Sequence, residues 1–454
     1  CCSGTYKNNY QLCCGIKENK DIMPLINEYL ILLFLYIVTC LWVIQKYYKR
    51  KLGVFQVPFI FSLASVLMMT PQFCVIIYNT HYDPNLLWDL TYCMITSTLA
   101  LSFGWDKAQD SSIYSCRDID LVKSKNTFLA LFLIGLYCAI QSYLQVVAHF
   151  LSDQSDIRTN HTYQILLFFM LYFDIGMFYA LTYIIRGKKA SKIIYFILII
   201  SSIYYLYIIL MLARRTLVVK LFMSLGILVA MLKPRWQKAI KIIIILFFTT
   251  GTIYQASIAL IRGNLRDNKE EKEQIDIWEN YKQSYISPNL VHGMDLGNAA
   301  LFIKHAKDNS TYTFGLSFWD DIVTWYFPSF IFGKQGKEDL KLAGTNDKYI
   351  TSVTHNVTTQ TGYYEAFEAF WYLGFILFYI FGYIFGYVWK RIGYSSLYLI
   401  VYLCFMFHIP SLASHGFSFV VGQIETFIVF CLPIIGKFIY KKKIIRQRIL
   451  KQIR

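Results

Sequence analysis

The feature that most constrains this chain is a series of about eleven windows, each of roughly 20 mostly apolar residues, the length that an α-helix needs to cross a bilayer. The windows leave one long polar interval, residues 262–363. Hydrophobic residues make up 56% and aromatic residues 18% of the 454 residues, and the mean hydropathy is +0.42. We therefore expect an all-α polytopic membrane protein.

Basic residues mark alternate ends of the predicted spans. Lys46 follows the first span, Lys188 follows the fifth and Lys390 follows the ninth. Because Lys and Arg collect in cytoplasmic loops, the N-terminus and the polar interval are both predicted to lie outside. The spans are expected at about 25–45, 54–78, a third ending near Trp105, 127–147, 163–185, 193–212, 216–232, 241–261, 364–389, 393–413, and an eleventh ending at a basic tail.

This topology divides the chain into five parts. We expect residues 1–22 to be a tag, an upstream translation or an extension without function, and residues 23–261 to form spans one to eight. Residues 262–363 form the large outer loop, 364–440 hold spans nine to eleven, and 441–454 form a basic cytoplasmic tail. The net charge of +16 comes mainly from runs beside span ends, which indicates anionic lipid headgroups rather than nucleic acid as the partner.

The outer loop contains an apolar, aromatic stretch, Phe314 to Phe332, with Asp320 and Asp321 at its middle. Such a stretch predicts an interfacial or re-entrant helix in the headgroup zone. The loop has no cysteine, so the sequence favours neither a disulfide-stapled module nor a zinc site there, and we expect no metal.

Two pairs of arginines lie at predicted outer ends and so oppose the charge rule. Arg214 and Arg215 occupy the turn between spans six and seven, whereas Arg262 and Arg266 stand four residues apart after span eight. A helix that continues past the membrane would place the second pair on one face. Either these residues snorkel to outer headgroups, or they clamp an anion such as a diphosphate, because guanidinium groups bind phosphate oxygens bidentately.

Candidate general bases lie in the loop and at its return to the membrane. His355 ranks first because it lies shortly before span nine, and His292 ranks second, although either could have only a structural or solvated role. Glu365 and Glu368 open span nine on one helix face. They could point into a shared cavity or pair with the arginines.

Ionisable residues inside predicted spans are rare and usually face the interior of a bundle. This chain has four that stand apart from one another in the sequence: Asp174, Lys220, His408 and Glu425. We interpret them mainly as buried polar contacts, and secondarily as part of a path for a lipid or a sugar.

The pattern resembles the Wzy-type polymerases of bacterial oligosaccharide repeat units, that is, the O-antigen polymerases. The resemblance is carried by the span count, the Ala213-Arg214-Arg215 turn, the large outer loop beginning at Arg262, and the passage GYYEAFEAFWYLG from Gly362 to Gly374. It covers most of the chain from Met23. The related O-antigen ligases share the layout.

The resemblance implies a glycosyltransferase fold of the C type (GT-C), in the bacterial inner membrane with a periplasmic catalytic loop and without metal, cofactor or nucleotide sugar. The growing glycan would pass from undecaprenyl diphosphate to a lipid-linked repeat unit, beside a chain-length regulator and a flippase. The four arginines would bind diphosphate, and His355, or else His292 or Glu365, would act on the acceptor hydroxyl.

Two alternatives to a polymerase stay open at this point. An O-antigen ligase would use the same fold with lipid A core as its acceptor. A flippase or other secondary transporter for lipid-linked oligosaccharides would be expected to show paired halves and charges lining the middle of the bundle. We find no internal repeat, which weighs mildly against the transporter.

Overall fold

The computed structural model describes residues 22–78, 84–110, 125–152, 161–187, 189, 191–212, 215–266, 295–327, 329–343, 361–414, 416–417 and 420. Within these ranges the regular structure is entirely helical. The α-helices are α1 (Ile22–Tyr48), α2 (Val57–Tyr78), α3 (Pro84–Asp110), α4 (Lys125–Ser152), α5 (His161–Ile185), α6 (Lys192–Leu212), α7 (Arg215–Leu232), α8 (Gln237–Arg266), α10 (Asp295–Asn309), α11 (Leu316–Tyr326), α12 (Ser329–Asp339), α14 (Gly362–Phe370), α15 (Phe375–Arg391), α16 (Ser396–Phe405) and α17 (Ser411–Ser414). Short 3-10 turns complete it: η1 (Gly53–Phe55), η4 (Pro234–Trp236), η6 (Trp371–Leu373) and η7 (Met406–His408).

Five described helices are long and apolar enough to cross a membrane, namely α1, α2, α3, α4 and α6, and a bent pair that runs from α14 into α15 is a sixth candidate. Shorter apolar helical stretches are Phe169–Ile185 in α5, Val218–Leu232 in α7, and Ser396–His408, which joins α16 and η7. The predicted eleventh span lies outside the described residues. The chain is thus an α-helical membrane protein, as its composition predicts.

Helix α1 shows the apolar surface that a bilayer requires. Ile31 and Phe34 expose 58% and 64% of their surface, and Leu30, Leu35, Val38, Leu41 and Trp42 are exposed beside them. In water so many adjoining exposed apolar side chains would drive aggregation, whereas lipid tails cover them without cost. The opposite face of α1, with Tyr36, Cys40 and Val43, is buried in the core.

Helix ends that the charge rule places inside contact one another. The Arg186 guanidinium after α5 donates to the carbonyls of Ile392 (3.0 Å) and Gly393 (2.6 Å) after α15. Lys390, at the end of α15, donates to the Gln109 carbonyl at the end of α3. These contacts group three predicted inner ends at one end of the bundle.

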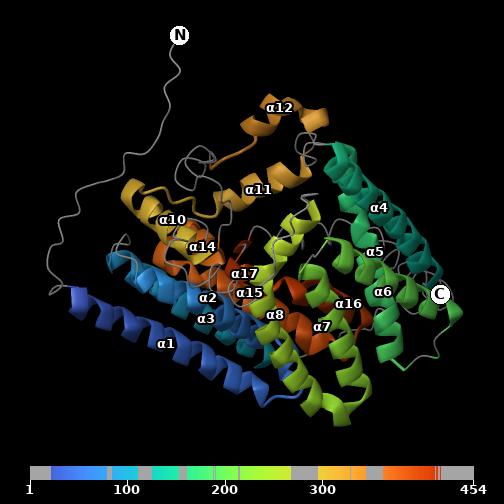
Figure 1. The fold of residues 1–454 in the computed structure, drawn as a ribbon, viewed down its shortest axis with the longest axis horizontal. Helices are drawn as coiled ribbons and strands as arrows, with labels where there is room; N and C mark the ends of the chain where they lie inside the picture. Colours follow the sequence, from blue (N-terminus) through green and yellow to red (C-terminus); the bar gives the residue numbers. More distant parts are fainter. Residues whose placement is uncertain are drawn as a thin grey trace, which may run out of the picture.

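Helices α10, α11 and α12 of the predicted outer loop lie together on one side of the bundle (Figure 1). Helix α10 packs on α2, α3 and α14, with Leu296, Ala299, Phe302 and Ile303 buried. The Leu296 amide donates to the Gln72 side-chain oxygen near the end of α2 (2.9 Å). The stretch predicted as one interfacial or re-entrant helix instead forms two helices, α11 and α12, on which Trp319 and Phe332 are exposed, and Phe314 is exposed in the turn before α11.

The predicted ninth span is not one straight helix. Its first part, α14 and η6, meets α15 at an angle of 112°. Trp371 adopts a positive φ of 55°, which ends α14, and a Cβ at Gly374 would lie 2.3 Å from the Ala366 carbonyl oxygen, so only glycine permits the sharp turn. Glu365 and Glu368 therefore lie on a separate helix and not at the start of a straight span.

Helices α3 and α15 pack backbone to backbone along a seam of glycines. A Cβ at Gly104 would lie 2.0 Å from the Tyr379 carbonyl oxygen, and one at Gly382 would lie 2.1 Å from the Leu101 carbonyl oxygen. Small residues allow this close approach between membrane helices, where van der Waals packing replaces the hydrophobic effect as the driving force.

Gly382→Val is expected to lower the free energy of unfolding by about 3 kcal/mol, the upper end for overpacking, because no flexible side chain can move aside at this seam. Unfolding of purified protein in mixed micelles by titration with SDS measures the change. Gly251→Ala in α8 is the control, since a Cβ there meets nothing within 4 Å. Equal stability of the two variants would contradict the backbone contact.

Candidate functional site

Helix α14 carries the candidate carboxylate Glu365 into the bundle. Thr361 caps the helix, its hydroxyl accepting from the Tyr364 amide at 3.3 Å. Two residues after the cap, the Tyr363 ring packs against Phe61 and Phe378, and its hydroxyl lies 3.1 Å from the Ser65 hydroxyl. The helix thus begins among the side chains of α2 and α15 and runs toward the outer-loop helices.

The side chain of Glu365 is buried, with 5% of the residue exposed. Gly416, at a φ of 86°, lies directly against it, because a Cβ there would come within 2.3 Å of its Oε1 atom. Any other residue at 416 would displace the carboxyl group as well as strain the backbone. The predicted site residue Glu365 therefore occupies a fitted interior position.

Glu368, on the next turn of α14, is half-buried beside the outer-loop helices. Its backbone carbonyl accepts from the Thr313 amide at 3.0 Å, which ties α14 to the turn between α10 and α11. Glu365 and Glu368 therefore differ in surroundings, although both were expected on one face.

Asp320, one of the two acidic residues in the aromatic stretch, has a structural role. Its carboxylate accepts from the Leu342 amide (2.7 Å) and the Ala343 amide (3.1 Å), and the residue is almost fully buried. These bonds hold the turn after α12 against α11. Asp321, its neighbour, is half-buried.

A second polar cluster lies inside the bundle, where three isolated ionisable residues of the sequence come together. Asp174 on α5 forms an ion pair with Lys220 on α7 at 2.5 Å and accepts a hydrogen bond from Tyr205 on α6. The Lys220 ammonium also lies 4.4 Å from the centre of the Phe407 ring, and His408 lines a cavity together with Asp174. The interpretation of Asp174 and Lys220 as buried polar contacts is confirmed, whereas Glu425 lies outside the described residues.

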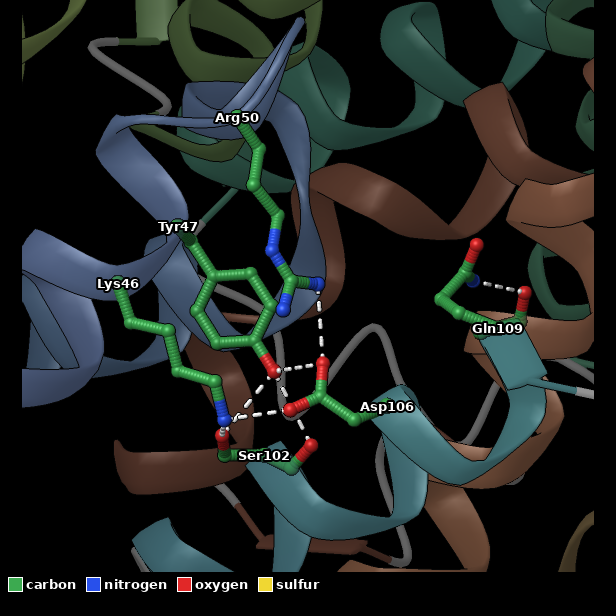
Figure 2. A network of polar contacts seen from close by, with 7 residues as sticks. Lys46, Tyr47, Arg50, Ser102, Asp106 and Gln109 are labelled. Atoms are coloured by element: carbon green, nitrogen blue, oxygen red, sulfur yellow. Dashed lines mark hydrogen bonds and ion pairs between the residues drawn. The ribbon is translucent and has the colours of Figure 1, made fainter.

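A third cluster, shown in Figure 2, ties α1 to α3 at the predicted inner end. Asp106 binds Lys46 and Arg50 (2.9 Å) and accepts from the Tyr47 hydroxyl (2.9 Å). The same hydroxyl lies 3.0 Å from the Ser102 hydroxyl. The cluster neutralises one carboxylate with two cations, which suits an anchor rather than a reactive centre.

We expect Asp106→Ala to lower the free energy of unfolding by about 1–2 kcal/mol, because three donors lose one acceptor in a partly exposed network. The difference should shrink at high salt, which screens accessible charges. Unfolding by SDS at low and at high salt measures both effects, with Asp110→Ala as the control on the same helix end. A loss of stability that does not respond to salt would argue for a packing effect instead.

For the remaining predicted site residues, the structure describes at most the backbone. Arg262 and Arg266 lie on the last turns of α8, which runs to Arg266 and so meets the condition for placing them on one helix face, and their side chains are not among those described. Arg215 is the first residue of α7, and its side chain is likewise undescribed. Arg214, His292 and His355 lie outside the described residues.

No family model, curated protein or solved structure matches this chain. Within the described ranges, no three His, Cys, Asp or Glu side chains form a group that could hold a metal ion.

Proposed function

We propose that this protein is a GT-C-type glycosyltransferase with about eleven spans that polymerises lipid-linked oligosaccharide repeat units at the periplasmic face of the bacterial inner membrane. The observation that carries the proposal is the path of α14, which brings the buried carboxylate of Glu365 from the outer-loop helices into the bundle. Irregular backbone at this depth is tolerated where it is buried in protein or lines a cavity, and broken helices often form substrate sites.

The reaction needs no cofactor in this proposal. The acceptor hydroxyl of a lipid-linked repeat unit attacks the anomeric carbon of the growing glycan, the bond from that carbon to the diphosphate oxygen breaks, and the electron pair leaves with undecaprenyl diphosphate. Cations stabilise the charge that develops on this leaving group. Arg214, Arg215, Arg262 and Arg266 would supply them, and α8 supports this by carrying the last two to one helix end.

A base removes the proton of the acceptor hydroxyl. His355, His292 and Glu365 remain the candidates, and Glu365 has the best support because its burial and its fit against Gly416 hold it in one place. The substrates are amphiphilic, so membrane lipids surround the reaction, and a chain-length regulator and a flippase would work beside the enzyme.

The test is the lipopolysaccharide or capsule ladder of a strain that lacks this gene. Core carrying a single repeat unit in the deletion, and a ladder restored by the wild-type gene, would support a polymerase. Core without any repeat, with long glycan accumulating on undecaprenyl diphosphate, would identify the ligase of the same fold. An unchanged ladder would refute both enzymes.

One observation favours a transporter as the second candidate function. Charged residues in the middle of a bundle are typical of transport paths, and the buried pair of Asp174 and Lys220 lies beside a cavity lined by His408. If the protein is a flippase for lipid-linked oligosaccharides, single repeat units should remain on the cytoplasmic leaflet of the deletion strain, because nothing moves them across. Their sensitivity to a membrane-impermeant periodate reagent in intact spheroplasts distinguishes the two functions.

A further inference from the structure

Trp371, in the sharp turn between α14 and α15, combines a strained backbone with an exposed ring. Its φ and ψ are 55° and −138°, a conformation that bulky residues rarely adopt, and 41% of the residue is exposed. Such strain persists only where the surrounding structure enforces it, and it concentrates at binding sites. The fold therefore holds a large aromatic ring at its surface against the preference of the backbone.

A second ring supports the indole from behind. The Tyr312 ring stacks on Trp371, with the ring centres 4.3 Å apart and the planes at 19°. Tyr312 lies in the turn between α10 and α11, where Ser310 and Phe314 also have positive φ. Its buried hydroxyl makes no hydrogen bond within the described part of the chain. Two strained turns from distant parts of the sequence thus meet to form one rigid aromatic platform.

Polar groups lie near this platform, because Tyr372, whose ring centre is 5.7 Å from that of Trp371, bonds to Asp89 at the predicted outer end of α3. The Asp89 carboxylate accepts from the Tyr372 hydroxyl (2.6 Å) and pairs with the Lys307 ammonium (2.7 Å). The bond with Asp89 raises the pKa of Lys307 above its usual 10.5, so the side chain stays cationic, and 42% of that side chain is exposed. An exposed cation, held in place by a buried carboxylate, therefore lies near the partly exposed indole of Trp371.

We propose that Trp371, backed by Tyr312 and edged by Lys307 and Asp89, binds a pyranose ring of a glycan. One face of a pyranose presents C–H groups that pack on an aromatic ring, while its equatorial hydroxyls point sideways toward donors and acceptors at the edge. The site lies at the outer end of the bundle, where a sugar next to a membrane-anchored diphosphate would be found. That the sugar belongs to a lipid-linked repeat unit rests on the proposed function; the sugar-binding site itself does not.

The rival explanation is an interfacial anchor, because tryptophan is enriched at membrane boundaries. The surroundings of an anchoring tryptophan would change with the bilayer, but they would not change when a sugar is added. It would also need neither the stacked Tyr312 nor the ordered pair of Asp89 and Lys307, which gives the sugar site the advantage.

The test uses the full chain labelled with 5-fluorotryptophan in lipid nanodiscs and in detergent micelles. The probes are methyl glycosides of common hexoses and N-acetylhexosamines, and the oligosaccharide released by mild acid from the lipid-linked intermediates of the source strain. We expect a saturable change in one ¹⁹F resonance, assigned to Trp371 by its absence in Trp371→Phe. Sorbitol, an acyclic polyol, should cause no saturable change.

Three variants test whether binding depends on this site. The affinity of each variant for the sugars is measured by saturation-transfer NMR on the sugar protons. Trp371→Gly relieves the positive φ, so it should fold at least as well as the wild type and bind at least about tenfold more weakly. Lys307→Met should weaken binding about fivefold. Trp319→Phe is the matched control, because its exposed indole is already engaged with the Leu340 carbonyl (2.9 Å), and it should bind like the wild type.

Absence of saturable binding with every probe, or wild-type affinity in Trp371→Gly, would overturn the site. A Trp371 resonance that differs between micelle and nanodisc but ignores sugars would identify a headgroup anchor and also overturn it. The outcome is separable from the proposed function: saturable binding together with an unchanged ladder in the deletion strain would refute the polymerase alone, and a lost ladder without binding would refute the sugar site alone.

Discussion

Glu365→Gln should slow polymerisation by about 10²–10⁴-fold, the usual contribution of a positioned acid or base. The amide has the shape of the carboxyl group and fits against Gly416, but it cannot accept the proton of the acceptor hydroxyl. The measurement is the single-turnover rate of glycan extension with purified lipid-linked repeat units. Thermal unfolding of the variant in micelles should match the wild type, which separates loss of chemistry from loss of fold.

Controls for this prediction come from the same helix and from the loop. Glu368→Gln, half-buried one turn away, should change the rate by less than about tenfold. His355→Ala and His292→Ala test the rival bases. If Glu365→Gln retains its rate while His355→Ala or His292→Ala abolishes it, the loop histidine is the base and Glu365 has only a structural role.

Asp174→Ala should reduce the free energy of unfolding by about 3–5 kcal/mol, because it leaves the Lys220 ammonium buried without its counter-charge. Both residues are less than 10% exposed, so water cannot compensate. Tyr205 also loses its acceptor, which adds to the effect. Unfolding of the purified protein by SDS titration measures the difference.

The double variant Asp174→Asn/Lys220→Met should recover most of this loss, since it removes both charges and keeps their volumes. It also distinguishes the two candidate functions. If the double variant folds and polymerises normally, Asp174 and Lys220 only hold α5 and α7 together. This result is expected for a polymerase whose site lies at the outer end of the bundle. One that folds but loses function would favour transport through the bundle. Failure of the double variant to recover stability would contradict the charge explanation.

Hydropathy was sufficient to place the long helices, because a helix that crosses a bilayer needs a continuous stretch of apolar residues. The apolar stretches of α1, α2, α3, α4 and α6 match their predicted spans to within a few residues. The same reasoning failed at residues 364–389, where the run is apolar apart from Glu365 and Glu368 and contains a turn of 112°. That turn depends on the backbone of Trp371 and on the contact between Gly374 and Ala366, which no average over a window detects.

The site was predictable in part. Intramembrane position was enough to single out Asp174 and Lys220, but their pairing joins positions 46 residues apart and needs the packing of α5 on α7. Glu365 was singled out because it opens the predicted ninth span, but its burial against Gly416 could not be read from the sequence. Asp89 was missed, because an acidic residue near a helix start has many ordinary roles, and only its contacts with Lys307 and Tyr372 distinguish it.

The glycine seam also sets the order in which the protein is built. Helix α3 finds its main partner, α15, only after some 270 more residues have been synthesised, since Gln109 bonds to the Gly386 carbonyl across a separation of 277 positions. Until then the face of α3 that carries Gly104 lacks its main helical partner. The contact between α3 and α15 therefore forms late in biogenesis, after most of the chain has been made, whereas α3 can pack on α1 and α2 much earlier.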